Sequence, residues 1–315
     1  MRKTCTDLVY ELAKHDSRIV FIGSDLGAGL LDQMKAEFPD RFFMEGVCEQ
    51  NLIGMAAGLA MEGFIPYLNT IATFITRRCY EQIAIDLCLH NLPVRLIGNG
   101  GGMVYAPLGP THMATDDIAI LRALPNMAVI APTDAEEMRR LMPKTVDWPG
   151  PMYIRLGKGG DAIVSKESDD FLIGKANSLR LGDDALIITT GIMASRALKA
   201  ADILAYEGIQ CGVLNMPTIK PIDKDCILNL AKNLRLIITV EEHTKIGGLG
   251  SAVSEVLIDE LGSNIPTLKR LGLPDIFPKH YGSQDVLLEE FGLDAQGIAE
   301  SIKHTYTDSI KKKIG

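Results

Sequence analysis

Short runs of consecutive apolar residues alternate with helical patterns along the whole chain. In the first half these runs lie at 19–23, 94–98, 127–132 and 152–156. A strand that is apolar on both faces is typical of a parallel sheet with helices on each side. Strand–helix alternation of this kind produces right-handed crossovers between parallel strands. The sequence therefore predicts an α/β fold with mostly parallel sheets.

The intervening helices and the second half of the chain follow the same alternation. Helical patterns of the first half lie at about 4–14, 30–37, 50–62, 73–90 and 134–146. Asp134 is the predicted N-cap of the last of these, with Glu137 three residues on. The second half is expected to form strands at 185–191, 212–216, 235–242 and about 266–272, with helices near 194–207 and 248–262.

A segment rich in glycine, serine and charge, 158–178, interrupts the alternation and predicts a crossing segment. We expect two doubly wound domains, at 1–165 and 181–315, joined by a linker at 166–180.

Composition excludes several classes of partner. The net charge of −8 and the pI near 5.3 argue against nucleic acid and against an anionic membrane surface. Six cysteines without a C-x-x-C pair fit reduced thiols. The sequence has no signal-peptide pattern and no apolar stretch of the roughly 18 residues that span a bilayer, so we expect a cytoplasmic protein.

Common catalytic motifs are absent from the sequence. The glycine clusters GNGGGM (98–103) and GGLGSAV (247–253) both lack the last glycine of a dinucleotide fingerprint. There is no Walker A loop and no G-x-S-x-G elbow, and the six histidines are too dispersed to predict a metal site.

Glu49 stands directly before a run of small and apolar residues at 52–60. Moving a carboxylate out of water is costly unless it is paired or protonated, so Glu49 is a candidate functional residue. The alternative is an acid that only stabilises a helix N-terminus.

The order of several motifs identifies a family. EGVCEQNLIGMAAGLAMEG is followed by NTIATFITRRCYEQIAID, LPVRLIGNGGG, GPTH, TTGIMASRALKAADIL, NMPTIKPID and VEEHTKIGGLGSAVSEVL. This series resembles the transketolase family, with its pyrimidine-binding domain followed by its C-terminal domain, over nearly the whole chain. The resemblance implies thiamin diphosphate as cofactor.

The GDG…N signature that binds diphosphate and Mg2+ in this family is missing here. The chain therefore resembles the C-terminal subunit of a split transketolase. The resemblance implies a partner subunit that carries GDG…N and Mg2+, an active site between the two chains, and an α2β2 assembly.

The resemblance also assigns cofactor residues. Glu49 would contact N1′ of the aminopyrimidine ring and share a proton with it, and Phe74 would stack on that ring. Ile71 falls where many members carry a second aromatic residue, and Asp25, in GSDLGAG, is a further cofactor-binding candidate. The alternative for Phe74 is an ordinary core residue.

Substrate residues follow in the same way. His112 in GPTH would bind the substrate or relay its proton, although a lone histidine in such a loop can be a solvated turn residue. Arg2 and Lys158 fall at or near phosphate-contacting positions, while Arg2 is equally open to interpretation as a mobile terminal charge. Arg77 and Arg78, in the R-x-x-E-Q helix, are interpreted as structural or interface residues.

Three positions depart from the family pattern: Gly29 replaces a phosphate-binding serine, Gly100 a substrate histidine and Leu108 an aspartate before GPTH. Lost hydrogen-bonding partners change substrate discrimination strongly. The substrate is therefore expected to be an unusual sugar phosphate, a nucleotide-linked sugar or an α-keto acid.

The leading hypothesis is transfer of a two-carbon ketol unit from a ketose to an aldehyde. The alternatives are the β subunit of a 2-oxo acid dehydrogenase and, in another class, a non-catalytic assembly partner. Deoxyxylulose-phosphate synthase is disfavoured because it is normally a single long chain.

Overall fold

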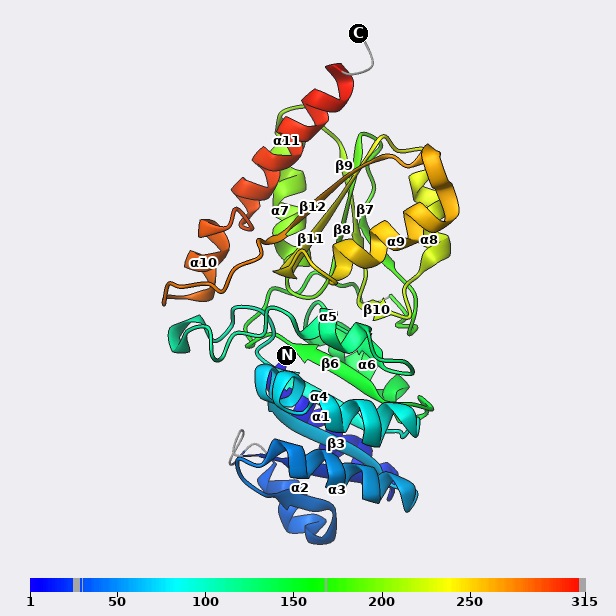
Figure 1. Ribbon diagram of the computed structural model, residues 1–315, viewed down its shortest axis with the longest axis vertical. Coiled ribbons are helices and arrows are strands. Elements are labelled where there is room, and N and C mark those ends of the chain that lie inside the picture. Colours follow the sequence, from blue (N-terminus) through cyan, green and yellow to red (C-terminus); the bar gives the residue numbers. More distant parts are fainter. Residues whose placement is uncertain (25–28, 30, 168, 312–315) are drawn as a thin grey trace.

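The computed structural model describes residues 1–24, 29, 31–167 and 169–311, with side chains up to residue 308. Two sheets lie one above the other, the first at the bottom of Figure 1 and the second at the top. The first sheet has seven strands in the order β10-β5-β6-β4-β3-β1-β2, and only the β10–β5 pair is antiparallel. Its strands are β1 (Ile19–Gly23), β2 (Phe42–Met44), β3 (Ile65–Ile71), β4 (Arg95–Asn99), β5 (Ala128–Ile130), β6 (Met152–Leu156) and β10 (Thr218–Lys220).

Helices cover both faces of this sheet. On one face α1 (Arg2–His15) packs against α6 (Ala135–Val146), and on the other α3 (Glu49–Met61) packs against the π-helical segments η2 (Phe74–Arg78) and η3 (Ile83–Leu89). The Asp134 side chain accepts hydrogen bonds from the backbone N–H groups of Glu136 and Glu137, which confirms the predicted N-cap of α6. Shorter helices α2 (Asp32–Glu37), α4 (Tyr80–Gln82) and α5 (Asp117–Arg122) complete this part.

The second sheet has five strands in the order β12-β11-β8-β9-β7, with β7 antiparallel to β9. Its strands are β7 (Asn177–Arg180), β8 (Ala185–Thr189), β9 (Cys211–Asn215), β11 (Leu236–Thr244) and β12 (Thr267–Leu273). One face is covered by α7 (Met193–Tyr206) and α11 (Ala295–Lys311), the other by α8 (Lys224–Ala231) and α9 (Leu249–Leu261), and α10 (Gln284–Glu290) lies beside α11 (Figure 1). The expected α/β class with two mostly parallel sheets is confirmed.

Several elements differ from the sequence-based expectation: β2, β7 and β10 were not predicted, and β7 lies within the expected linker 166–180. The long helix expected at 73–90 is divided into η2, α4 and η3. Strand β3 was not predicted, and it contains Pro66, which cannot donate a ladder hydrogen bond. The sheet tolerates this proline because pairing of β3 with β4 begins only at Tyr67.

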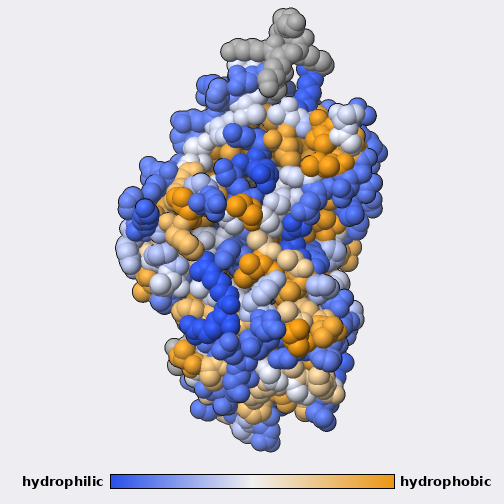
Figure 2. Space-filling view, viewed as in Figure 1, coloured by the Kyte–Doolittle hydropathy of each residue, from blue (hydrophilic) through white to orange (hydrophobic). Residues whose placement is uncertain are grey.

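The two domains share apolar core. Buried residues of α3 and η3 belong to the same cluster as residues of β8, α8 and α9. On the face shown in Figure 2, apolar residues lie in small patches separated by hydrophilic ones. Within the described ranges, no helix has the length and apolar character that a membrane crossing requires.

Candidate active site

The carboxyl ends of the parallel strands of the first sheet gather most of the predicted site residues. Glu49 follows β2, Phe74 follows β3, His112 lies in the connection after β4, and Lys158 follows β6. In open α/β sheets, ligands bind in crevices at this edge. The fold therefore brings together residues that are far apart in the sequence.

Glu49 is the first residue of α3 and is 1% exposed. Its Oε2 accepts a hydrogen bond from Nη1 of Arg78 at 2.6 Å. Its Oε1 is also buried and has no hydrogen-bond partner among the described residues. The apolar side of α3, formed by Leu52, Ile53 and Ala56, is buried in the core and fixes where this acid lies. Glu49 is thus a buried acid with one oxygen available to a further partner.

Phe74 contacts both His112 and Arg78, the partner of Glu49. The rings of Phe74 and His112 make an edge-to-face contact, with centroids 5.2 Å apart and an interplanar angle of 67°. The guanidinium carbon of Arg78 lies 4.3 Å from the centroid of Phe74. We call Glu49, Phe74, Arg78 and His112 the acid–ring cluster. π-Helical turns such as η2, which carries both Phe74 and Arg78, occur frequently at functional sites.

The GPTH loop is held by contacts at both of its ends. The Thr73 hydroxyl donates to the backbone carbonyl of His112 at 3.1 Å, and the Thr111 hydroxyl lies 2.9 Å from His112 Nδ1. A Cβ atom at Gly109 would lie 2.6 Å from the Tyr281 ring, so the second domain contacts this loop closely. These contacts fix His112 beside Phe74.

The other predicted residues lie around this centre. Ile71 ends β3 and is partly buried, and Asp25 lies outside the described residues. The segments that carry Arg2 and Lys158 meet, because the Met1 backbone nitrogen lies 3.8 Å from Asp161 Oδ2. Within the described part of the chain, neither Arg2 nor Lys158 has an ion-pair partner.

Gly100 leaves no room for the histidine that the family pattern has there. An added Cβ would lie 2.2 Å from Cε2 of Tyr105, so the tyrosine ring fills this space. Leu108 is 51% exposed and precedes the GPTH loop. The substrate side of the site therefore presents a different set of groups from the family pattern.

A second group of buried charges connects the two domains. Arg155 Nε donates to Asp117 Oδ2 at 2.8 Å, the Tyr153 hydroxyl donates to the same oxygen at 2.7 Å, and Arg155 Nη2 donates to the Glu242 carbonyl at 2.9 Å. His243 Nε2 lies 4.0 Å from Asp117 Oδ1. We call Asp117, Tyr153, Arg155, Glu242 and His243 the interdomain network.

Burial and neighbouring charges shift the pKa values of the carboxyl groups in this network in opposite directions. Burial raises the pKa of Glu242, whose Oε1 accepts from the Met103 N–H and from Gln284 Nε2. Burial alone would also raise the pKa of Asp117, but Arg155 and His243 lower it overall. The EEH motif of the second domain therefore anchors one domain on the other, a role that the sequence analysis did not assign to it.

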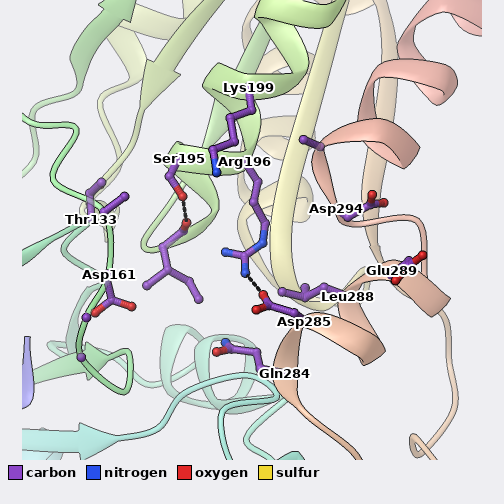
Figure 3. A pocket seen from close by; sticks show the side chains of 15 residues that line it. Thr133, Asp161, Ser195, Arg196, Lys199, Gln284, Asp285, Leu288, Glu289 and Asp294 are labelled. Carbon is purple, nitrogen blue, oxygen red and sulfur yellow. Dashed lines mark hydrogen bonds and ion pairs between the residues drawn. The ribbon is translucent and has the colours of Figure 1, made fainter.

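A cavity of about 530 Å3 lies elsewhere between the domains. Figure 3 shows Thr133 and Asp161 on one side of it, facing Ser195, Arg196 and Lys199 of α7, with Asp285 paired to Arg196. No member of the acid–ring cluster lines this cavity.

The acid–ring cluster fits an aminopyrimidine ring. Such a ring needs an acid for its nitrogen N1′ and an aromatic face for stacking. The unpartnered Oε1 of Glu49 provides the first, and the partly exposed ring of Phe74 provides the second. Sequence reasoning found both residues but missed the contact of Arg78 with each of them.

Comparison with known families agrees with this geometry. Residues 1–160 match the transketolase pyrimidine-binding domain, and residues 174–298 match the transketolase C-terminal domain. The chain belongs to the transketolase family. Its pyrimidine-binding domain implies thiamin diphosphate as the cofactor of the transketolase.

Several relatives of this transketolase chain are separate subunits. The 6-deoxy-6-sulfo-D-fructose transketolase subunit SqwH of Clostridium sp. (strain MSTE9) is 39% identical over 303 residues, covering 96% of this chain and 92% of that protein. One of the subunits of the apulose-4-phosphate transketolase of Phocaeicola vulgatus is 37% identical over 302 residues, covering 95% of each. A solved split-gene transketolase, described as an inactive beta4 tetramer, has a TM-score of 0.89 at 36% identity and covers 97% of this chain and 98% of that one. The chain is thus the corresponding subunit of a split transketolase, which implies a partner subunit.

Proposed function

We propose that this subunit transfers a two-carbon ketol unit from a ketose to an aldehyde, in an active site shared with its partner subunit. The observation that carries the proposal is Glu49, a buried acid with an unpartnered oxygen, whose partner Arg78 also lies on the ring of Phe74. The diphosphate and Mg2+ would be held by a GDG…N motif of the partner, in an α2β2 assembly in the cytoplasm. The domain limits of 1–165 and 181–315 stay a prediction.

Each residue of this chain has a distinct role in the proposal. Thiamin diphosphate, when bound, supplies the nucleophilic carbon of the transfer. Glu49 holds a proton at N1′ of its aminopyrimidine, since a positioned acid at this nitrogen controls the charge of the ring. Phe74 and Ile71 orient the ring, with Asp25 as a further cofactor residue. His112 donates a hydrogen bond to the substrate oxygen or moves its proton.

For the substrate we propose a ketose with a terminal anionic group. Arg2 and Lys158 supply cations on adjoining segments without ion-pair partners among the described residues. The names of two relatives contain a sulfo sugar and a sugar phosphate. The altered positions Gly100 and Leu108 favour a sugar other than the usual pentose phosphates. Lys158→Ala should raise KM for an anionic ketose about tenfold or more, with little change for an uncharged one.

The main test uses the reconstituted assembly of this subunit and its partner. Glu49→Gln should lower ketol transfer by about 10²- to 10⁴-fold, the usual contribution of a positioned acid. Glu45→Gln is the matched control, because this exposed acid lies in the same connection before α3. Undiminished turnover by Glu49→Gln would favour a non-catalytic assembly partner, and activity with a 2-oxo acid alone would favour the dehydrogenase alternative.

A further inference from the structure

Arg78 has no role in the mechanism above, yet it contacts both residues that would hold the aminopyrimidine. Its Nη1 lies 2.6 Å from Glu49 Oε2, and its guanidinium carbon lies 4.3 Å from the Phe74 centroid. Glu49 and Arg78 are 29 residues apart in the sequence and meet only in the fold, whereas Phe74 and Arg78 are the first and last residues of η2.

The guanidinium occupies a stacking position. A planar group 4.3 Å from a ring centroid is within the distance at which cations and rings stack on phenylalanine. His112 meets the same ring edge to face at 5.2 Å. A cofactor ring that stacks where the guanidinium lies cannot do so while Arg78 remains there.

Arg78 also occupies one oxygen of Glu49. Its Nη1 donates to Oε2 of Glu49 at 2.6 Å, while Oε1 has no partner among the described residues. In the proposed function N1′ binds Oε1, the oxygen of Glu49 that has no partner among the described residues. The guanidinium and the aminopyrimidine therefore compete for the ring of Phe74 and not for the same oxygen of Glu49.

Arg78 is able to leave. Its side chain is 41% exposed, whereas that of Glu49 is 1% exposed. Within the described ranges, the side chain of Arg78 has no partner beyond Glu49 and Phe74. Rotation toward solvent therefore breaks two contacts and leaves no other buried group of Arg78 unsatisfied.

We propose that Arg78 occupies the stacking position on Phe74 in the cofactor-free subunit and is displaced when the aminopyrimidine binds. We call this role of Arg78 the placeholder. This inference rests on the proposed function. In the cofactor-free subunit Arg78 pairs with the buried Glu49 and lies on the ring of Phe74. On binding, N1′ takes the unpartnered Oε1 of Glu49 and the aminopyrimidine replaces the guanidinium on Phe74, so Arg78 is a positioning residue that weakens cofactor affinity.

The test measures the Kd for thiamin diphosphate by calorimetry, with Mg2+ present and the assembly freed of cofactor. Arg78→Ala should tighten binding about tenfold, which corresponds to about 1.4 kcal/mol. Arg77→Ala is the matched control, because Arg77 is the adjacent residue of η2 but pairs with Asp116 at 2.9 Å. Its Kd should stay within about twofold of the wild type.

Thermal unfolding supplies a second readout that does not depend on activity. Arg78→Ala should lower the Tm of the cofactor-free assembly and leave that of the saturated assembly unchanged, because only the free form loses a contact. If Arg78→Ala does not assemble, Arg78→Gln keeps much of the side chain without its charge and should still tighten binding at least threefold.

An unchanged Kd for Arg78→Ala would overturn the placeholder, because it would mean that Arg78 is not displaced by the cofactor. A higher Kd would overturn it as well, because it would mean that Arg78 contacts the bound cofactor. Cofactor binding by the wild type then leaves the proposed function intact. If the wild-type assembly binds no thiamin diphosphate at all, the proposed function and the placeholder both fail.

Discussion

The molecule contains two buried acid–arginine pairs that have similar chemistry and different surroundings. Glu49 and Asp117 are both buried, at 1% and 0% exposure, and each lies at the start of a helix. Arg155, the partner of Asp117, is 7% exposed in its side chain, whereas Arg78, the partner of Glu49, is 41% exposed.

The number of partners separates the two pairs further. Arg155 donates to Asp117 and to the carbonyls of Ala114 and Glu242, and Asp117 also accepts from Tyr153. Arg78 has one hydrogen-bonding partner among the described side chains. A buried pair enclosed on all sides fixes the domains, while a pair with one side open to solvent can exchange its partner for a ligand.

The largest expected effect tests the enclosed pair of Asp117 and Arg155. Arg155→Met should lower the free energy of unfolding by about 3–5 kcal/mol, because it leaves Asp117 buried without its counter-ion. Urea unfolding measures this change, and Arg139→Met, at a largely exposed helix pair, should cost under about 1 kcal/mol. A similarly small loss at Arg155 would abolish the contrast between the two pairs.

Glu137 extends the comparison to a buried acid held by amide donors. Its oxygens accept from the Thr133 N–H and from Asn215 Nδ2, which lies in the second domain. Burial raises the pKa of Glu137 from its ordinary 4.5 to about 7. The stability from the protonated form is fully present below pH 4.5 and is lost as the pH rises through 7.

The resulting pH dependence amounts to about 3 kcal/mol for this acid. Unfolding measured from pH 4.5 to 8 should show the loss in the wild type, and Glu137→Gln should flatten it. Glu136→Gln, which changes the exposed neighbouring acid, should keep the wild-type profile. An unaltered profile in Glu137→Gln would assign the pH dependence to other groups.

Gly102 tests how closely the interdomain network is packed. Its φ is +66°, and an added Cβ would lie 2.4 Å from Cδ of Glu242. Gly102→Ala should cost about 1–3 kcal/mol from overpacking, in addition to backbone strain. Gly208→Ala has a similar positive φ of +82° with nothing within 4 Å of the Cβ, and so measures the strain alone. Equal losses would show that the contact with Glu242 adds nothing.

The smallest expected effect tests the pair of Glu49 and Arg78, which is open to solvent on one side. Glu49→Gln should change the free energy of unfolding of the cofactor-free chain by less than about 1 kcal/mol, because an ion pair with a partly exposed arginine contributes little. Asp117→Asn should destabilise the chain several-fold more. Equal losses in chemical unfolding would mean that the pair of Glu49 is structural.

Much of the fold and part of the site could be predicted from the sequence. The runs at 19–23 and 152–156 coincide with β1 and β6. The N-cap Asp134 was predicted correctly, since capping depends on residues within one turn. Strand β3 was missed because Pro66 weakens the strand signal, and β10 was missed because it pairs with β5, about ninety residues away in the sequence.

By itself the sequence determined the α/β class, the family and the candidates Glu49, Phe74 and His112. Local periodicity and the order of motifs can be recognised in the sequence without a structure. Only the tertiary structure decided that Arg78 lies on Phe74, that Glu242 reaches Met103, and that Tyr105 fills the space beside Gly100. Glu242 and Met103 are 139 residues apart in the sequence, and the direction of each of these side chains depends on the packing of its neighbours, which no local pattern encodes.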